Sequence, residues 1–148
     1  MVMHRTLGEM PGPRAEMSAV IARWDPATHK LHLANCGHVP PAVIRDDEEV
    51  EHLRVPEGSG LGGRSRPTPA ERSTELRPGD RLVMVSDGVM KAAHGQAGLD
   101  SDRVVEAASR SERRTAADTV RQIHAAVLEK AAGELDDDAT AVCLAVNE

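Results

Sequence analysis

Apolar residues in the first half of the chain come in short runs separated by turn residues, a pattern typical of β-strands. Residues 17–24 and 31–35 flank the turn sequence Asp25-Pro26-Ala27-Thr28, and we therefore predict a hairpin. Because residues 17–24 include apolar side chains on both faces of the predicted strand, this strand is expected to be largely buried. A helix within residues 1–10 should end before Pro11, which cannot extend the helical hydrogen-bond pattern.

Three shorter strands are expected further along the chain, at residues 42–45, 50–55 and 73–76. The first should lie near a sheet edge, because Pro40 and Pro41 precede it and proline donates no backbone hydrogen bond. Residues 56–69 are rich in Gly, Pro, Ser and Arg, which predicts an exposed loop. The sequence Arg77-Pro78-Gly79-Asp80 is typical of a type II turn, and it leads into the apolar run 82–85.

The apolar spacing becomes helical after residue 100. Residues 101–109 predict one helix, and Thr115 with Asp118 forms a capping-box pattern before a second. The second helix has its apolar positions at 116, 120, 123, 127 and 131, with Gly133 as its C-terminal cap. A last strand is expected within residues 139–146. Strands followed by helices and a returning strand predict an α+β fold, in a single domain over residues 1–148.

The composition argues against several classes of partner. Trp24 is the only aromatic residue among 148, and the formal net charge is −6, so neither nucleic acid nor an anionic membrane is an expected partner. Cys36 and Cys143 are too few for a disulfide framework, and both are expected to be buried free thiols. No apolar run approaches the roughly 20 residues of a membrane-spanning helix, and residues 1–5 do not resemble a signal peptide. We therefore expect a cytoplasmic protein.

Two acidic clusters flank the most strand-like runs. Ser86-Asp87-Gly88 directly follows residues 82–85, and Asp136-Asp137-Asp138 directly precedes residues 139–146. A carboxylate at a strand end is held rigidly, and two carboxylates that approach each other favour a divalent cation between them. Oxygen ligands of this kind suit Mg²⁺ or Mn²⁺. The sequence therefore predicts part of a metal site for phosphate chemistry, while Asp87 alone is equally compatible with capping a turn before a helix.

Five segments together resemble one family. Residues 34–41 (Ala-Asn-Cys-Gly-His-Val-Pro-Pro) resemble the NAGHxPP segment of bacterial PP2C-like, or PPM-type, serine/threonine phosphatases of the sporulation stage II protein E group. The other four are similar to that group's PLG, LxPGDxL, TDGV and DDxT motifs: Gly60-Leu61-Gly62, residues 76–82, Ser86-Asp87-Gly88-Val89 and Asp137-Asp138-Ala139-Thr140. Their order and spacing agree with the group across residues 17–146.

The resemblance implies a fold of two packed antiparallel sheets flanked by helices, the PP2C-like β-sandwich. It implies a pair of Mn²⁺ or Mg²⁺ ions in a cleft, with Asp87 and Asp137 among their ligands. Members of the family hydrolyse phosphoserine or phosphothreonine through direct attack by a water that bridges the two metals. The substrate implied for this group is a phosphorylated regulatory protein, commonly an anti-sigma-factor antagonist.

One motif of the family has no counterpart in this chain. The family carries an earlier Gly-Gly-Asp segment whose aspartate bridges the two metals, whereas the acidic residues here before Asp25 are Glu9 and Glu16. The chain therefore resembles the C-terminal two-thirds of the domain, incomplete at its N-terminus, and we expect it to hold at most one cation. The alternative is a catalytically dead pseudophosphatase that binds a partner. Sheet edges left open by missing strands would favour a homodimer.

Several polar residues near these motifs have simpler structural interpretations. Asn35 is expected to fix the turn after the second strand through its side-chain amide. His38 is expected to be a hydrogen-bonded structural residue, with a role as a general acid or base as its alternative. Asp138 should face solvent or the loop, with metal contact through water as its alternative. Arg64 and Arg66 are expected to be ordinary exposed loop residues, with contact to a phosphoprotein as theirs.

Overall fold

A computed structural model describes residues 2–11, 16–55, 59–64, 66–91, 99–131, 135 and 137–147 of the chain. They form two compact units, one built from Met1–Pro40 with Arg54–Glu75 and the other from Pro41–Leu53 with Leu76–Glu148. Within the described ranges, the first unit holds a helix and a three-stranded sheet, and the second holds a four-stranded sheet with three helices. None of the helices in these ranges is long and apolar enough to cross a bilayer.

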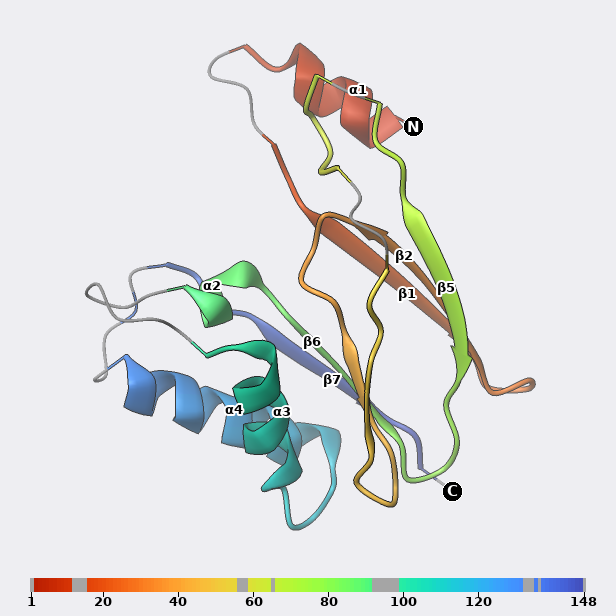
Figure 1. The fold of residues 1–148 in the computed structure, drawn as a ribbon, viewed down its shortest axis with the longest axis vertical. Helices are drawn as coiled ribbons and strands as arrows, with labels where there is room; N and C mark the ends of the chain where they lie inside the picture. The colour runs from red at the N-terminus through yellow and green to blue at the C-terminus, as the bar shows by residue number, and fades with distance from the viewer. Residues whose placement is uncertain are drawn as a thin grey trace. The chain divides into compact units, whose positions relative to one another are not determined.

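The sheet of the first unit is built on the predicted hairpin. Its elements are α1 (Val2–Glu9), β1 (Ala19–Asp25), β2 (Lys30–Cys36) and β5 (Ala70–Glu75). The strands are antiparallel in the order β1-β2-β5 (Figure 1), and β1 pairs with β2 from Ala19 opposite Cys36 to Asp25 opposite Lys30. In the connecting turn, Asp25 Oδ1 accepts a hydrogen bond from the Ala27 backbone N–H at 3.0 Å. The hairpin and the N-terminal helix are confirmed.

Strand β1 is less buried than its sequence suggests. Ile21 is 70% exposed, Arg23 is exposed as well, and the other residues of the strand are half-buried. Within the described chain β1 pairs only with β2, so it forms one edge of this sheet. Alternate residues of a strand point to opposite faces, and the face that carries Ile21 and Arg23 is open to solvent. The prediction of a largely buried strand is therefore wrong.

The Gly- and Pro-rich segment 56–69 is only partly exposed at the positions that the structure describes. In its described part, Leu61 is 8% exposed and Pro67 is fully buried. Leu61 exchanges two backbone hydrogen bonds with Met17, at 2.9 and 2.7 Å. The prediction of an exposed loop is wrong at these positions, because the pairing partner lies far away in the sequence. Strand β5 likewise begins at Ala70 rather than at Ser73.

The second unit combines a four-stranded sheet with helices. Its strands are β3 (Ala42–Ile44), β4 (Val50–His52), β6 (Arg81–Val85) and β7 (Ala141–Ala145), and its helices are α2 (Asp87–Met90), α3 (Ser101–Ser109) and α4 (Ala116–Lys130). All neighbouring strands are antiparallel, in the order β4-β3-β6-β7. Helices α3 and α4 lie side by side (Figure 1), with α4 packed on β7 and α3 in contact with β3. The α+β class and the antiparallel sheets are confirmed.

Strand β3 lies inside this sheet and not at its edge. It pairs with β4 on one side and with β6 on the other, and all three of its residues are buried. The edge prediction is wrong because Pro40 and Pro41 lie before the strand. Every residue of β3 therefore keeps the backbone N–H that it needs for pairing. Instead, the Pro41 carbonyl accepts a hydrogen bond from the Leu53 N–H at 2.8 Å, which extends the pairing towards β4.

The turn into β6 is the one that its sequence predicts. Gly79 has φ +89°, as the third position of a type II turn requires, and the Asp80 N–H donates to the Arg77 carbonyl at 3.0 Å. The Asp80 side chain is 4% exposed and accepts from Arg45 Nη1 at 2.7 Å. It also accepts from the Arg77 N–H at 2.9 Å and the Asp46 N–H at 3.3 Å. This network joins the turn, the end of β3 and the start of β6.

Helix α4 buries the apolar face that its sequence predicts. Ile123 and Val127 on that face are buried. Thr115 Oγ1 caps the helix by accepting a hydrogen bond from the Asp118 N–H at 3.2 Å, as the capping-box pattern indicates. Helix α3 also spans the predicted residues. The expected C-terminal cap, Gly133, lies outside the described residues.

A buried polar group lies between these helices and the sheet. Arg81 of β6 is 1% exposed, and its Nη1 donates to the Ala108 carbonyl and to Thr119 Oγ1, both at 3.0 Å. Burial raises the pKa of the neighbouring Cys143 thiol, although a hydrogen bond with Thr119 and the charge of Arg81 act in the opposite direction. Cys143 and Cys36 are both free and half-buried, so the prediction of buried free thiols holds in part.

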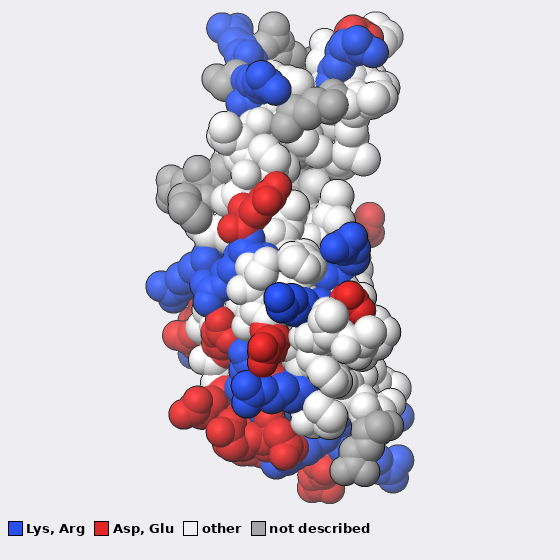
Figure 2. Space-filling view, turned by 90° about the vertical axis from the view of Figure 1, so that its right-hand side faces the viewer, with Lys and Arg blue, Asp and Glu red and all other residues white. Residues whose placement is uncertain are grey.

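Charges of both signs are mixed on the surface. On the face that Figure 2 shows, Lys and Arg side chains are interspersed with Asp and Glu. In the second unit, for example, Arg114 Nη1 lies 3.0 Å from Asp46 Oδ1 and its Nη2 lies 3.0 Å from Glu48 Oε1. Arginines that are paired in this way, on a chain of net charge −6, offer little to a polyanion.

Candidate metal centre

Asp87 is positioned by the junction between β6 and α2. It is the first residue of α2, and its side chain is 67% exposed. Ser86, directly before it, is tied to the start of the last strand by two hydrogen bonds. The Ser86 N–H donates to the Thr140 carbonyl, and the Thr140 N–H donates to Ser86 Oγ, both at 2.9 Å. The end of β6 and the entry to β7 are thereby held together.

Asp137 lies in the loop that enters β7, and its side chain is 46% exposed. Its Oδ1 accepts a hydrogen bond from the Asp138 N–H at 2.9 Å, which orients the carboxylate. The same loop touches α2 at Gly88, where an added Cβ would stand 2.9 Å from the Asp138 carbonyl carbon and overlap its oxygen. Glycine permits this approach, so the backbone next to Asp87 lies against the loop that carries Asp137.

Both carboxylates meet at Lys91. Its Nζ lies 3.4 Å from Asp87 Oδ2 and is hydrogen-bonded to Asp137 Oδ2. That hydrogen bond lowers the pKa of Asp137 and raises the pKa of Lys91. Two predicted ligands from separate segments thus face one point, where a positive charge already sits. Lys91 is absent from the predicted site, although its spacing of four from Asp87 is typical of a charge pair on a helix.

The donors at this point suit one small divalent cation. Two carboxylates provide the oxygen ligands that Mg²⁺ and Mn²⁺ take, with waters in the remaining positions. Among the described residues, no group of three or more His, Cys, Asp and Glu side chains is placed to hold a metal ion. Asp136 lies outside those residues, and the Asp138 side chain is exposed. The described side chains therefore fit a single, weakly held cation, and a ligand role for Asp87 and Asp137 stays a prediction.

Asn35 and His38, in the first unit, have the structural role that their sequence context predicts. Asn35 is 2% exposed; its Nδ2 donates to the His38 carbonyl at 3.0 Å, and its Oδ1 accepts from the His38 N–H at 2.8 Å. The His38 ring Nδ1 lies 3.0 Å from the Val39 carbonyl. These contacts close the turn after β2. Arg64 and Arg66 are exposed, as expected of loop residues.

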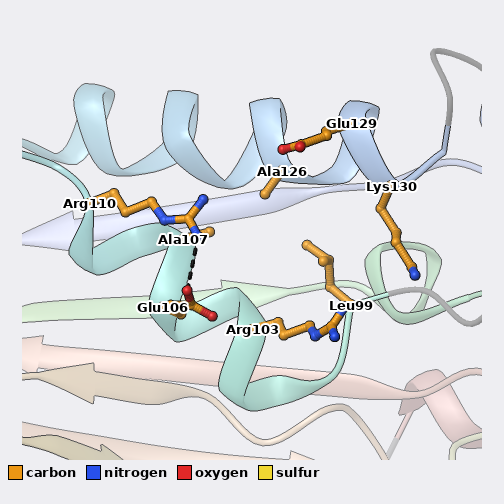
Figure 3. A pocket seen from close by; sticks show the side chains of 8 residues that line it. All are labelled: Leu99, Arg103, Glu106, Ala107, Arg110, Ala126, Glu129 and Lys130. Atoms are coloured by element: carbon orange, nitrogen blue, oxygen red, sulfur yellow. Dashed lines mark hydrogen bonds and ion pairs between the residues drawn. The ribbon is translucent and has the colours of Figure 1, made fainter.

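A separate pocket of about 430 Å³ lies between α3 and α4 (Figure 3). Charged side chains from both helices line it, and Arg110 Nη2 is paired with Glu106 Oε1 at 2.9 Å. The lining residues are Leu99, Arg103, Glu106, Ala107, Arg110, Ala126, Glu129 and Lys130. Neither predicted metal ligand lines this pocket, so it takes no part in the candidate metal centre.

A sequence model of the stage II sporulation protein E family (SpoIIE) matches residues 2–147. The chain belongs to the SpoIIE family. The matched region contains every motif on which the resemblance rests, including Ser86-Asp87-Gly88 and the loop with Asp137. SpoIIE-type domains are PPM serine/threonine phosphatases, and related phosphatases depend on Mn²⁺ or Mg²⁺. A comparison with curated proteins gave no match.

Solved phosphatases share the fold of this SpoIIE-family chain. The Mn-presoaked SpoIIE phosphatase domain of Bacillus subtilis is 17% identical, with a TM-score of 0.73 over 89% of this chain and 57% of its own. The SiaA PP2C domain of Pseudomonas aeruginosa is 18% identical, with a TM-score of 0.79 over 97% and 58%. The PPM Ser-Thr phosphatase MsPP of Mycobacterium smegmatis, in complex with cacodylate, is 20% identical, with a TM-score of 0.69 over 98% and 68%.

At these identities, the likeness to solved structures shows the fold alone. It confirms the PP2C-like fold class that the sequence motifs predict for this SpoIIE-family chain. The chain spans less than two thirds of the SpoIIE and SiaA domains that it matches, at 57% and 58% of their lengths.

Proposed function

We propose that this chain supplies metal ligands in a protein serine/threonine phosphatase, with Asp87 and Asp137 holding Mn²⁺ or Mg²⁺. One observation carries the proposal. The two carboxylates, one after β6 and one before β7, converge on the single ammonium of Lys91. Two carboxylate oxygens directed at one point favour a positive charge there. The chain belongs to a phosphatase family, which supports a catalytic divalent metal as that charge.

Neighbouring residues fix the positions of the two carboxylates in this site. Asp87 and Asp137 provide negative oxygens, while Ser86 and Gly88 fix the segments that carry them. A divalent cation bound there would lower the pKa of a coordinated water and offset negative charge on a phosphoryl group. Because the two carboxylates are 67% and 46% exposed, a phosphorylated side chain of another protein can approach them.

The proposed substrate is phosphoserine or phosphothreonine in a regulatory protein of the anti-sigma-factor antagonist type. Support comes from the family and from a solved relative that contains RsbU and RsbW domains, Rv1364c of Mycobacterium tuberculosis. That protein is 18% identical, with a TM-score of 0.72 over 95% of this chain and 38% of its own. We place the activity in the cytoplasm. Neither nucleic acid nor a membrane surface is an expected partner, because the net charge is −6.

Replacing either Asp87 or Asp137 with asparagine should weaken Mn²⁺ binding at least ~10-fold, because loss of even an indirect metal contact has an effect of that size. Isothermal titration calorimetry measures the affinity, and hydrolysis of a phosphoserine peptide with Mn²⁺ measures turnover. Asp102→Asn is the matched control, since Asp102 belongs to the same unit and its side chain is 87% exposed. Equal Mn²⁺ affinity in all three variants would contradict a ligand role for Asp87 and Asp137.

A partner-binding module without turnover is the second candidate function. It is favoured by the fact that the described residues bring only two carboxylates together, with Lys91 between them. In that case Mn²⁺ gives no hydrolysis of the phosphoserine peptide, while the chain still binds its regulatory protein. Turnover that disappears in Asp87→Asn decides for the enzyme.

The proposal includes a homodimer formed along β1. In the described chain β1 has a strand partner on one side only, and Ile21 on it is 70% exposed. An unpaired strand edge offers its backbone N–H and C=O groups to a second copy. Sedimentation velocity should show a dimer that Ile21→Lys weakens, because a charge on an edge strand opposes pairing. A wild-type chain that sediments as a monomer contradicts this part of the proposal.

A further inference from the structure

We propose that Lys91 is an internal counter-cation that competes with the divalent metal for Asp87 and Asp137, an inference that rests on the proposed metal site. Lys91 Nζ lies 3.4 Å from Asp87 Oδ2 and is hydrogen-bonded to Asp137 Oδ2. These are oxygens that a cation held by both residues would use. An ammonium and a divalent cation cannot share them, because like charges at such separations repel strongly. Metal binding therefore requires Lys91 to leave.

Contacts that do not involve Lys91 keep the two segments together. Ser86 and Thr140 exchange two hydrogen bonds at 2.9 Å, from the end of β6 to the entry of β7. Gly88 packs against the backbone of Asp138, with no room for a Cβ between them. The carboxylates therefore stay near each other when Lys91 departs. Loss of the lysine removes a competitor without dismantling the site.

The environment of Lys91 allows it to depart. Its side chain is 50% exposed, and it stands at the C-cap of the four-residue helix α2. A lysine ammonium sits on a flexible stem of four carbons and is readily hydrated, so Nζ can turn from the carboxylates into water. Without metal, this ammonium offsets one of the two carboxylate charges. The affinity of the chain for metal is consequently lower than the same carboxylates would have alone.

Lys91→Gln should bind Mn²⁺ about 10-fold more tightly than the wild-type chain in calorimetry, because glutamine is polar but carries no charge that competes with the metal. Lys91→Arg keeps the charge and should bind Mn²⁺ no more tightly than the wild type. Lys130→Gln removes one positive charge from the same unit and is the matched control, with unchanged affinity. Circular dichroism of each metal-free variant verifies that it is folded.

The melting temperature gives a second readout that does not depend on turnover. At equal Mn²⁺ concentration, the rise in melting temperature should be larger for Lys91→Gln than for the wild type, because tighter binding stabilises the folded state more. If the wild type binds Mn²⁺ and Lys91→Gln binds it no more tightly, competition by Lys91 is overturned while the metal site stands. If neither chain binds Mn²⁺, the competition and the proposed metal site fail together.

Discussion

Replacing Asp80 with alanine is expected to lower the free energy of unfolding by about 2–3 kcal/mol, because it removes a charge-assisted hydrogen bond to the partly buried Arg45. The Asp80 side chain is 4% exposed and accepts from Arg45 Nη1 at 2.7 Å. Arg45 would keep its ion pair with Glu51. The substitution would also leave the backbone donors of Arg77 and Asp46 without this acceptor, at a further cost. Urea unfolding followed by circular dichroism measures the loss.

Two comparisons separate this network from a general effect of charge. Asp80→Asn keeps an acceptor oxygen and removes the negative charge, so it should destabilise the chain less than Asp80→Ala. Glu112→Ala removes an exposed carboxylate in the same unit and should change the free energy of unfolding by no more than about 0.5 kcal/mol. If Asp80→Ala proves as stable as Glu112→Ala, the buried carboxylate does not hold the turn.

Gly88→Ala should weaken the candidate metal centre and the fold together. The new Cβ would overlap the Asp138 carbonyl oxygen and lie 3.4 Å from the Ala139 Cα. These are backbone atoms, so α2 and the loop before β7 must move apart, which we expect to cost about 1–3 kcal/mol. The same movement carries Asp87 away from Asp137. Calorimetry should therefore find weaker Mn²⁺ binding, and thermal unfolding should find a lower melting temperature.

Gly8→Ala is the matched control for that substitution. Gly8 lies in α1, and the nearest heavy atom to its added Cβ is the Gly62 carbonyl oxygen at 3.9 Å. Alanine favours a helix over glycine by about 1 kcal/mol, so this variant should keep or gain stability with unchanged Mn²⁺ affinity. Wild-type affinity in Gly88→Ala would mean that the contact between α2 and the loop does not set the spacing of the carboxylates.

The turns and helix starts were predictable because each depends on a few neighbouring residues. Gly79 occupies the one turn position that needs a positive φ, and the turn forms around it. Thr115 lies three residues before Asp118 and caps α4 from that position. The hairpin of β1 and β2 follows in the same way from Pro26 between two alternating runs.

Features that depend on distant residues were not predictable from local patterns. Strand β3 is interior because β4 and β6 both pair with it, and Pro41 before it does not reveal those partners. Leu61 is buried through its pairing with Met17, although its neighbours in the sequence are typical of an exposed loop. In both cases composition describes the segment, while burial is decided by what packs against it.

The two carboxylates of the candidate metal centre could be predicted from the sequence, whereas the position of Lys91 between them could not. Asp87 and Asp137 stand in two sequence motifs, and the antiparallel pairing of β6 with β7 brings the motifs together. The spacing of Lys91 from Asp87 indicates one ion pair on a helix. Its second contact, with Asp137, exists because Gly88 lets the loop lie against α2, and no local pattern predicts that approach.

The hydrogen-bond acceptors of Arg81 determine how its contacts respond to acid. In the described chain its guanidinium bonds to neutral groups only, among them the Ala108 carbonyl in the last turn of α3. The end of a helix presents partial negative charge there. Peptide carbonyls do not take up protons in mild acid, whereas carboxylates do. The strand that leads to Asp87 is thus fastened to α3 by a contact that acidification leaves intact.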